Sequence, residues 1–161
     1  MGWYTLGIIL ITITRRLEFD AGHRIPHHSG QCVNLHGHRY VIELTLCGQV
    51  NAHNGASDEG MLMDFGQIKT LGQQYLVDQW DHAFLVYRED YAVVDFLASL
   101  PKHKTVVLDC VPTVENLVKV AYQTLYPIFS EHFTKQLWLE RVKLYETPNC
   151  WAEVSRDLST M

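Results

Sequence analysis

Apolar residues predict β-strands in two early segments. The run from Leu6 to Phe19 is rich in Ile, Leu and Thr, and it ends where Asp20 begins a stretch typical of a turn. Tyr40 to Gly48 alternates apolar and polar positions. One face of this second strand is therefore expected to carry Tyr40, Ile42, Leu44 and Leu46. The segment 24–34 contains proline and glycine, which predicts a loop between the strands.

Two later segments have the period of amphipathic helices. Asp64 followed by Gln67 is typical of a helix start, and apolar residues continue at helical spacing to about Trp80. Thr113 is a suitable N-cap for a second helix, in which apolar residues recur three and four positions apart to about His132.

The chain closes with two more predicted strands, Leu137 to Tyr145 and Trp151 to Val154. Between the helices lies an insert at about 87–110, where the pattern favours a short helix over 90–100 and a short strand over 105–108. This order predicts one domain over residues 1–161, of the α+β class. We expect an antiparallel sheet with two helices on one face.

Composition limits the possible partners. The 161 residues are 47% hydrophobic and 19% charged, with a net charge of -5, which disfavours nucleic acid or an anionic membrane as a partner. The apolar run at Leu6 to Ile13 is too short to span a bilayer. Four cysteines without a CxxC pair indicate reduced thiols and a cytoplasmic protein, although the count also permits two disulfides.

Histidines near the first two strands suggest a metal site. Side chains two apart on a strand share a face, so His36 and His38 can bind one ion, and His23 offers a third imidazole. Three neutral nitrogen donors suit Zn2+ and leave one tetrahedral position open, as in catalytic zinc sites. Gly37 between the two histidines adds no side chain that would crowd the ion.

Six short motifs follow one another along nearly the whole chain. They are Phe19-x-Ala21-x-His23, Cys32-x3-His36-Gly37-His38, Gly60-Met61-x2-Asp64-Phe65-x3-Lys69, Asp81-His82-x2-Leu85, Pro112-Thr113-x-Glu115-Asn116 and Glu146-Thr147. With the order of strands and helices, they resemble the 6-pyruvoyl-tetrahydropterin synthase and 6-carboxytetrahydropterin synthase family.

The resemblance implies the tunnelling fold. In this fold a four-stranded antiparallel sheet carries two helices on one side, and subunits join edge to edge into a β-barrel. The assembly is commonly a homohexamer made of two trimers, with active sites between subunits. Unpaired sheet edges give an independent physical reason to expect a homo-oligomer.

The resemblance also assigns roles to residues of the site. It implies that His23, His36 and His38 hold zinc, that Cys32 is the proton-transferring base, that Asp81 and His82 complete a relay with it, and that Glu146 anchors the pterin. A nearby cation favours a thiolate, and a carboxylate can accept two adjacent N–H groups of a pterin.

Other polar residues have more than one possible role. Thr113 and Glu115, at a helix start, are further candidates for the pterin pocket, although Glu115 also simply suits a helix N-terminus. Arg15, Arg16 and Arg24 either meet a triphosphate or face solvent. The remaining histidines are expected at the surface: His27, His28, His53, His103 and His132.

The function implied by the resemblance is that of a zinc-dependent lyase acting on 7,8-dihydroneopterin triphosphate. The preferred activity is 6-carboxy-5,6,7,8-tetrahydropterin synthase of queuosine and deazapurine biosynthesis, which releases triphosphate and acetaldehyde. The alternatives are 6-pyruvoyl-tetrahydropterin synthase, which eliminates triphosphate only, and a non-catalytic pterin- or metal-binding relative. The stretch Ala83-Phe84-Leu85-Val86, where many relatives end in asparagine, and the long insert leave the substrate preference open.

Overall fold

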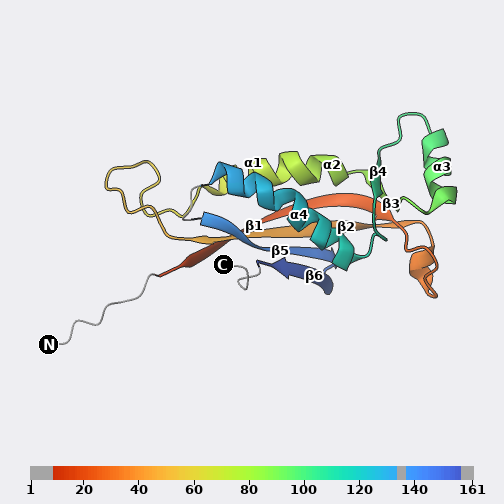
Figure 1. Cartoon of the computed structure of the whole chain (residues 1–161), viewed down its shortest axis with the longest axis horizontal. Helices are drawn as coiled ribbons and strands as arrows, with labels where there is room; N and C mark the ends of the chain where they lie inside the picture. Colours follow the sequence, from red (N-terminus) through yellow and green to blue (C-terminus); the bar gives the residue numbers. More distant parts are fainter. Residues whose placement is uncertain (1–8, 134–136, 157–161) are drawn as a thin grey trace.

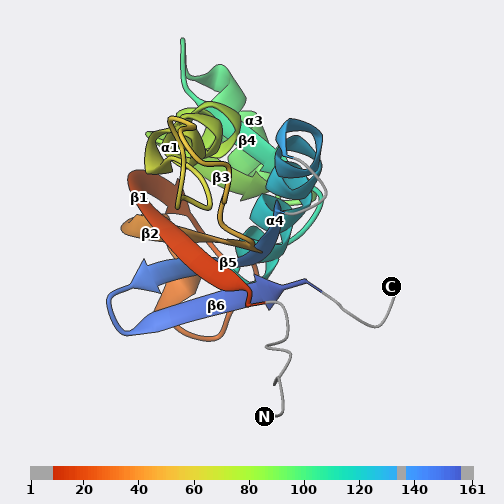
Figure 2. The same ribbon diagram turned by 90° about the vertical axis from the view of Figure 1, so that its left-hand side faces the viewer.

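A computed structural model describes residues 9–133 and 137–156. Within them, one curled sheet carries helices on one face (Figures 1 and 2). The strands are β1 (Ile11–His23), β2 (His36–Gly48), β3 (Ala83–Tyr87), β4 (Thr105–Leu108), β5 (Leu137–Thr147) and β6 (Cys150–Ser155). The helical segments are a 3-10 turn (Gln31–Val33), α1 (Phe65–Gly72), a π-helical stretch (Gln73–Val77), α2 (Asp78–Trp80), α3 (Tyr91–Ser99) and α4 (Val114–His132).

The long strands β1, β2, β5 and β6 pair antiparallel, and their apolar faces meet the helices. The predicted inner face of β2 is confirmed, because Tyr40, Ile42, Leu44 and Leu46 are fully buried. Leu117, Leu125 and Phe129 of α4 are buried in the same core. Burial of this apolar surface is the main force that holds α4 to the sheet.

Strand β1 ends four residues later than the sequence predicted and begins at Ile11, so the predicted strand residues Ile9 and Leu10 lie before it. The predicted turn at 20–23 is wrong, because β1 continues to His23, which pairs with His36 at the start of β2. The same end of β1 pairs with β3 on its other side, so strands on both sides hold these residues extended. The predicted residues Leu6 to Ile8 lie outside the described part of the chain.

The expected sheet of four antiparallel strands is corrected to a mixed sheet of six in the described residues. Their order is β4-β3-β1-β2-β5-β6, with β3 parallel to β1 and β4 parallel to β3. Strand β3 was not predicted, because its short run Ala83–Tyr87 follows a helix directly and lacks polar alternation. The fold class remains α+β.

Both predicted helix starts are confirmed. The Asp64 side chain accepts a hydrogen bond from the backbone N–H of Gly66, and the Thr113 side chain accepts one from Asn116. The first helix ends at Trp80 as predicted, but it contains the π-helical stretch. In the insert, the expected short helix and strand are present as α3 and β4.

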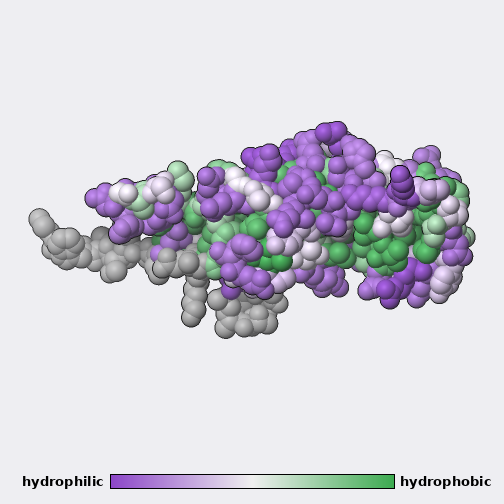
Figure 3. Space-filling model, turned by 90° about the horizontal axis from the view of Figure 1, so that it is seen from above, coloured by the Kyte–Doolittle hydropathy of each residue, from purple (hydrophilic) through white to green (hydrophobic). Residues whose placement is uncertain are grey.

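The helix-covered side of the molecule is mostly hydrophilic (Figure 3). Hydrophobic side chains nevertheless remain exposed on the insert, including Tyr91, Phe96 and Val107. No helix in the described part of the chain is both long enough and apolar enough to cross a bilayer.

Candidate functional site

Three histidines meet where β1 ends and β2 begins. His23 lies opposite His36 in the strand pairing, and His38 lies opposite Ala21, so the three side chains share one face of the sheet. Their ring centroids are 4.6 to 5.1 Å apart. One nitrogen from each ring can be chosen so that all three lie within 4.8 Å of one another. The structure therefore brings together the three histidines that the sequence predicted as metal ligands.

Backbone carbonyls orient two of these rings. The Nδ1 atom of His23 donates to the carbonyl oxygen of Pro112 at 2.7 Å, and Nδ1 of His36 donates to that of Asn34 at 2.8 Å. In the neutral rings this leaves each Nε2 atom with a free lone pair. Nε2 of His23 is buried and has no hydrogen-bond partner. An orphaned buried acceptor among three imidazoles fits a divalent metal ion such as Zn2+.

Burial disfavours the protonated forms of His23 and His38. It lowers the pKa of His23 to about 4, although the hydrogen bond to Pro112 acts in the opposite direction. The pKa of His38 is also lowered, chiefly by burial and against the attraction of Glu146. A histidine binds a metal through an unprotonated nitrogen, so these shifts favour ligation at neutral pH.

Glu146 reaches this site from a β-bulge. Tyr145 pairs with Trp151 and Thr147 pairs with Cys150, so Glu146 is the extra residue of β5. Such a bulge redirects a side chain. Its carboxylate oxygen lies 3.5 Å from Nε2 of His23 and 3.9 Å from that of His38.

A cavity of about 670 Å³ opens beside this carboxylate. Glu146 and His38 line it together with Arg16, Arg39 and Tyr145. Its size suits a small heterocyclic ligand. Glu146 and a metal-ligand candidate thus border the same cavity.

The sequence reasoning assigned Tyr40 to the core and missed its place beside the histidines. The ring centroid of Tyr40 lies 5.7 Å from His38 and 6.0 Å from His23. Its hydroxyl is buried without a hydrogen-bond partner, and burial raises its pKa. The signal was available, since Tyr40 is two residues after His38 on the same strand face.

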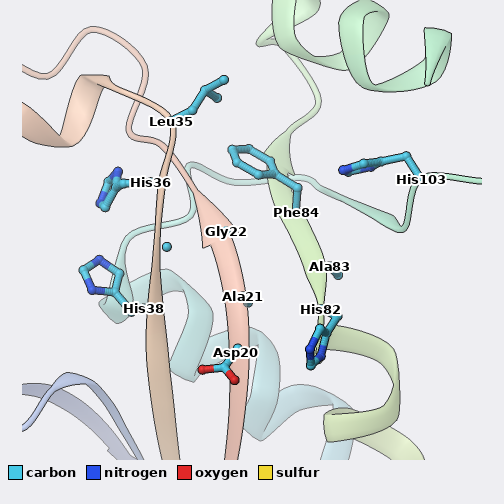
Figure 4. Close-up of a pocket in the computed structure, with 11 residues that line it drawn as sticks. Asp20, Ala21, Gly22, Leu35, His36, His38, His82, Ala83, Phe84 and His103 are labelled. Carbon is cyan, nitrogen blue, oxygen red and sulfur yellow. The ribbon is translucent and has the colours of Figure 1, made fainter.

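Asp81 and His82 form a second group, separated by β1 from His36 and His38. They lie at the start of β3, and the side chain of His82 lies across β1 from His36 and His38 (Figure 4). The Asp81 carboxylate is 2.9 Å from Nδ1 of His82. It also accepts the backbone N–H of Asp20 at 3.0 Å, which is the main reason that its pKa is lowered.

An open cavity of about 520 Å³ has residues of both groups in its lining. Its lining includes His36 and His38 at one end and His82 at the other, with Phe84 and His103 nearby (Figure 4). His82 has φ 57°, and its side chain is 78% exposed. The predicted surface position of His103 is confirmed, but its place in this cavity was not foreseen, because it follows from the missed pairing of β3 with β4.

Cys32, Thr113 and Glu115 lie outside the linings of the two cavities. Cys32 lies on the 3-10 turn before β2 and is partly buried. All four cysteines are free, so the alternative of two disulfides is wrong. The Thr113 hydroxyl caps α4, and Glu115 is exposed. In the part of the chain that the structure describes, none of these three lines either cavity, so their roles stay predictions.

The other polar residues divide between surface and structure. His27, His28, His53 and His132 are exposed, as expected. Arg16 lines the larger cavity. Arg24 is instead paired with Asp90 of the insert, and Nε of Arg15 is buried without a hydrogen-bond partner.

Sequence comparison agrees with this arrangement. Residues 12–157 match the family model described as 6-pyruvoyl tetrahydropterin synthase. The chain belongs to the 6-pyruvoyl tetrahydropterin synthase family. A relative named 6-carboxy-5,6,7,8-tetrahydropterin synthase, from Rickettsia bellii, is 37% identical over 90% of this chain and 100% of its own length. A protein of the same name from Rickettsia conorii is 38% identical with the same coverage.

Solved structures share the fold of this family member. An uncharacterised protein from Wolinella succinogenes matches with a TM-score of 0.73 at 18% identity, over 92% of this chain and 99% of that one. The 6-pyruvoyl tetrahydropterin synthase of Caenorhabditis elegans matches with a TM-score of 0.64 at 23% identity, over 93% and 98%. These likenesses establish the fold.

Proposed function

We propose that this protein is a zinc-dependent 6-carboxy-5,6,7,8-tetrahydropterin synthase that converts 7,8-dihydroneopterin triphosphate with loss of triphosphate and acetaldehyde. The observation that carries the proposal is the buried, unpartnered Nε2 atom of His23 facing two further imidazoles and Glu146. Relatives of that name, 37% and 38% identical over 90% of the chain, support the choice of reaction.

His23, His36 and His38 would hold the zinc ion. When bound, zinc supplies Lewis-acid chemistry that acidifies bonds of the substrate side chain. Glu146 accepts hydrogen bonds from the pterin amino group and ring N–H, which orients the pterin beside the histidines. The position of Glu146 next to both His23 and His38 supports this role.

Proton movement falls to Cys32 and His82. Cys32 acts as a base only as a thiolate, the form that a nearby positive charge favours. The ion pair with Asp81 orients His82, whose exposed ring can take up or return a proton at the neighbouring carbon. Cys32 is a free, partly buried thiol, and the side chain of His82 is exposed and borders the cavity of about 520 Å³.

Product analysis tests the proposal. Purified, zinc-loaded protein is incubated with 7,8-dihydroneopterin triphosphate, and acetaldehyde and triphosphate are measured together. We expect both in equal amounts, and we expect Cys32→Ala and His82→Ala to lose turnover while retaining zinc. Triphosphate without acetaldehyde, with a pyruvoyl pterin as product, would contradict the preferred reaction.

A second candidate is 6-pyruvoyl-tetrahydropterin synthase, which is the name of the matching family model and of the matching Caenorhabditis elegans structure. The triphosphate release without acetaldehyde described above identifies it. A non-catalytic relative would release neither product. In that case Cys32→Ala and His82→Ala would show the same lack of turnover as the wild-type protein.

We further propose that the protein is a homo-oligomer, a hexamer of two trimers. Strand β3 pairs only with residues 21–23 of β1, so the rest of that edge of β1 has no partner strand in the described residues. Strand β6 forms the opposite edge of the sheet. Open edges of this kind favour pairing with another copy. Light scattering that gives a monomer mass at micromolar concentration would contradict this assembly.

The remaining expectations concern location and pathway. We propose a cytoplasmic enzyme of queuosine and deazapurine biosynthesis. Four free cysteines, of which Cys150 is exposed, are compatible with a reducing compartment.

A further inference from the structure

The insert at residues 87–110 is tied to the loop that carries Cys32. The guanidinium of Arg24, one residue after His23, meets the carboxylate of Asp90 through two hydrogen bonds of 2.6 and 2.8 Å. Asp90 is 7% exposed, although it belongs to an otherwise peripheral element. A planar, two-point pair of this kind fixes direction as well as distance.

Asp90 does not use its carboxylate in the usual way for its position. It is the N-cap residue of α3, where an aspartate side chain ordinarily accepts a helix N–H. Here the side chain makes no capping hydrogen bond, and both oxygens are bound to Arg24. The pair therefore serves the contact between the insert and the loop rather than the start of the helix.

The same guanidinium and the next residue, Ile25, contact the backbone beside Cys32. Nη1 of Arg24 donates to the carbonyl oxygen of Val33 at 3.4 Å, and the backbone N–H of Ile25 donates to the carbonyl oxygen of Cys32 at 2.8 Å. Residues 24 and 25 thus bind the two peptide groups on either side of Val33, which are the first two after the Cα of Cys32. The loop gains its position from Asp90 through Arg24.

The insert itself is suited to serve as an anchor. Val93 and Leu97 of α3 pack with Val86 of β3 in a small hydrophobic cluster apart from the main core. Strand β3 in turn pairs with the end of β1 that carries His23. Asp90 is therefore fixed relative to His23 by the sheet, while the loop of residues 24–34 contains no strand.

We propose that the Arg24–Asp90 pair is a positioning pair that uses the insert to hold the Cys32 thiol in place for proton transfer. This inference rests on the proposed function, because it takes Cys32 as the base. Neither residue is expected to touch substrate. The insert then has a catalytic consequence without contributing a reacting group.

The test uses Arg24→Gln, Asp90→Asn and the double variant in the full-length, zinc-loaded protein. We expect kcat to fall by about 10- to 100-fold, as for a misplaced reacting group, with KM nearly unchanged because Glu146 is untouched. Each single variant and the double variant should show similar losses, since the pair acts as one unit. The matched control is Asp109→Asn, which removes the exposed 2.6 Å pair of Arg88 and Asp109 in the same insert.

Two readouts do not depend on turnover. Hydrogen exchange in peptides covering residues 24–34 should be faster in both single variants, and the rate of Cys32 alkylation, resolved from the other thiols by peptide mass spectrometry, should change. Zinc content should stay at the wild-type level. Unchanged exchange and alkylation, or a loosened loop with unchanged kcat, would overturn the proposal, as would activity loss explained by loss of zinc.

These readouts also separate the two proposals. If the wild-type protein does not convert the pterin triphosphate, the proposed function fails, and altered Cys32 alkylation in Arg24→Gln and Asp90→Asn still decides whether the pair positions the thiol. Arg24→Lys keeps the charge and loses the two-point geometry. Thermal melting shows whether Arg24→Gln or Asp90→Asn is unstable, and Arg24→Lys then provides a folded comparison. An alkylation rate of Cys32 in Arg24→Lys equal to that of the wild type would count against the proposal.

Discussion

The Nδ1 atom of His23 donates a 2.7 Å hydrogen bond to the carbonyl oxygen of Pro112, which stands just before the N-cap of α4. This bond fixes the ring of His23 with Nε2 directed away from the helix start. It also links the end of β1, which carries His23, to α4, the longest helix in the described residues. The candidate metal site is therefore held by the packing of α4 as well as by strand pairing.

The neutral His23 ring makes stability depend on pH. Its pKa is about 4 in the folded protein and 6.5 in the unfolded chain. Above pH 6.5 both states are neutral; as the pH falls from 6.5 towards 4, the unfolded chain binds a proton that the fold does not. We expect metal-free protein to lose on the order of 3 kcal/mol of stability across this window.

Urea denaturation of chelated protein at pH 7 and pH 5 measures this effect. His23→Asn, whose amide N–H can still donate to Pro112, should lose much of the pH dependence, whereas exposed His53→Asn should retain it. If the free energy of unfolding changed equally between pH 7 and pH 5 in His23→Asn and in the wild type, another group would be responsible.

Removal of any one proposed metal ligand should abolish stable zinc binding. We expect His36→Ala and His38→Ala to lower zinc affinity by more than about 100-fold, beyond the range for residues that only support a ligand. Elemental analysis after dialysis against a weak chelator gives the zinc content per chain. The exposed His28→Ala is the control, and a full zinc content in all three variants would place the metal elsewhere.

Gly37 is required between His36 and His38 because the neighbouring strand leaves no room for a side chain at this position. An added Cβ would lie 2.9 Å from the carbonyl oxygen of Ala21 on the neighbouring strand, and backbone cannot move away as a side chain can. Gly37→Ala should therefore displace His36 and His38 and weaken zinc binding by about 10-fold or more. Competition with a chromogenic chelator measures the affinity. Gly30→Ala, which meets only the exposed His28 side chain, should bind zinc as wild type does.

Glu146→Gln should weaken pterin binding while leaving the fold intact. The amide keeps the size of the side chain but replaces one acceptor by a donor, so charge-assisted hydrogen bonds worth roughly 1.5–3 kcal/mol are lost. KM for the pterin triphosphate, or Kd for a non-reactive pterin, should rise by about 10- to 100-fold. Glu153→Gln on the exposed face of β6 is the control. An unchanged Kd would remove Glu146 from the binding site.

The local pattern of the chain was sufficient for the long elements and for two of the histidines. Alternation over Tyr40 to Leu46 gave β2 its buried face, and capping residues located both main helices. His36 and His38 could be grouped because side chains two apart on a strand share a face. His23 was added as a third imidazole, and only the pairing of β1 with β2 places it beside them.

Only tertiary structure decided how distant segments meet. The extension of β1 to His23 depends on β2 and β3 pairing with it from both sides, and the aim of Glu146 depends on a bulge between β5 and β6. The bonds from His23 to Pro112 and from Arg24 to Asp90 span 89 and 66 positions. Local propensity carries no information on such pairings, because their free energy arises only when the whole sheet and its helices are packed together.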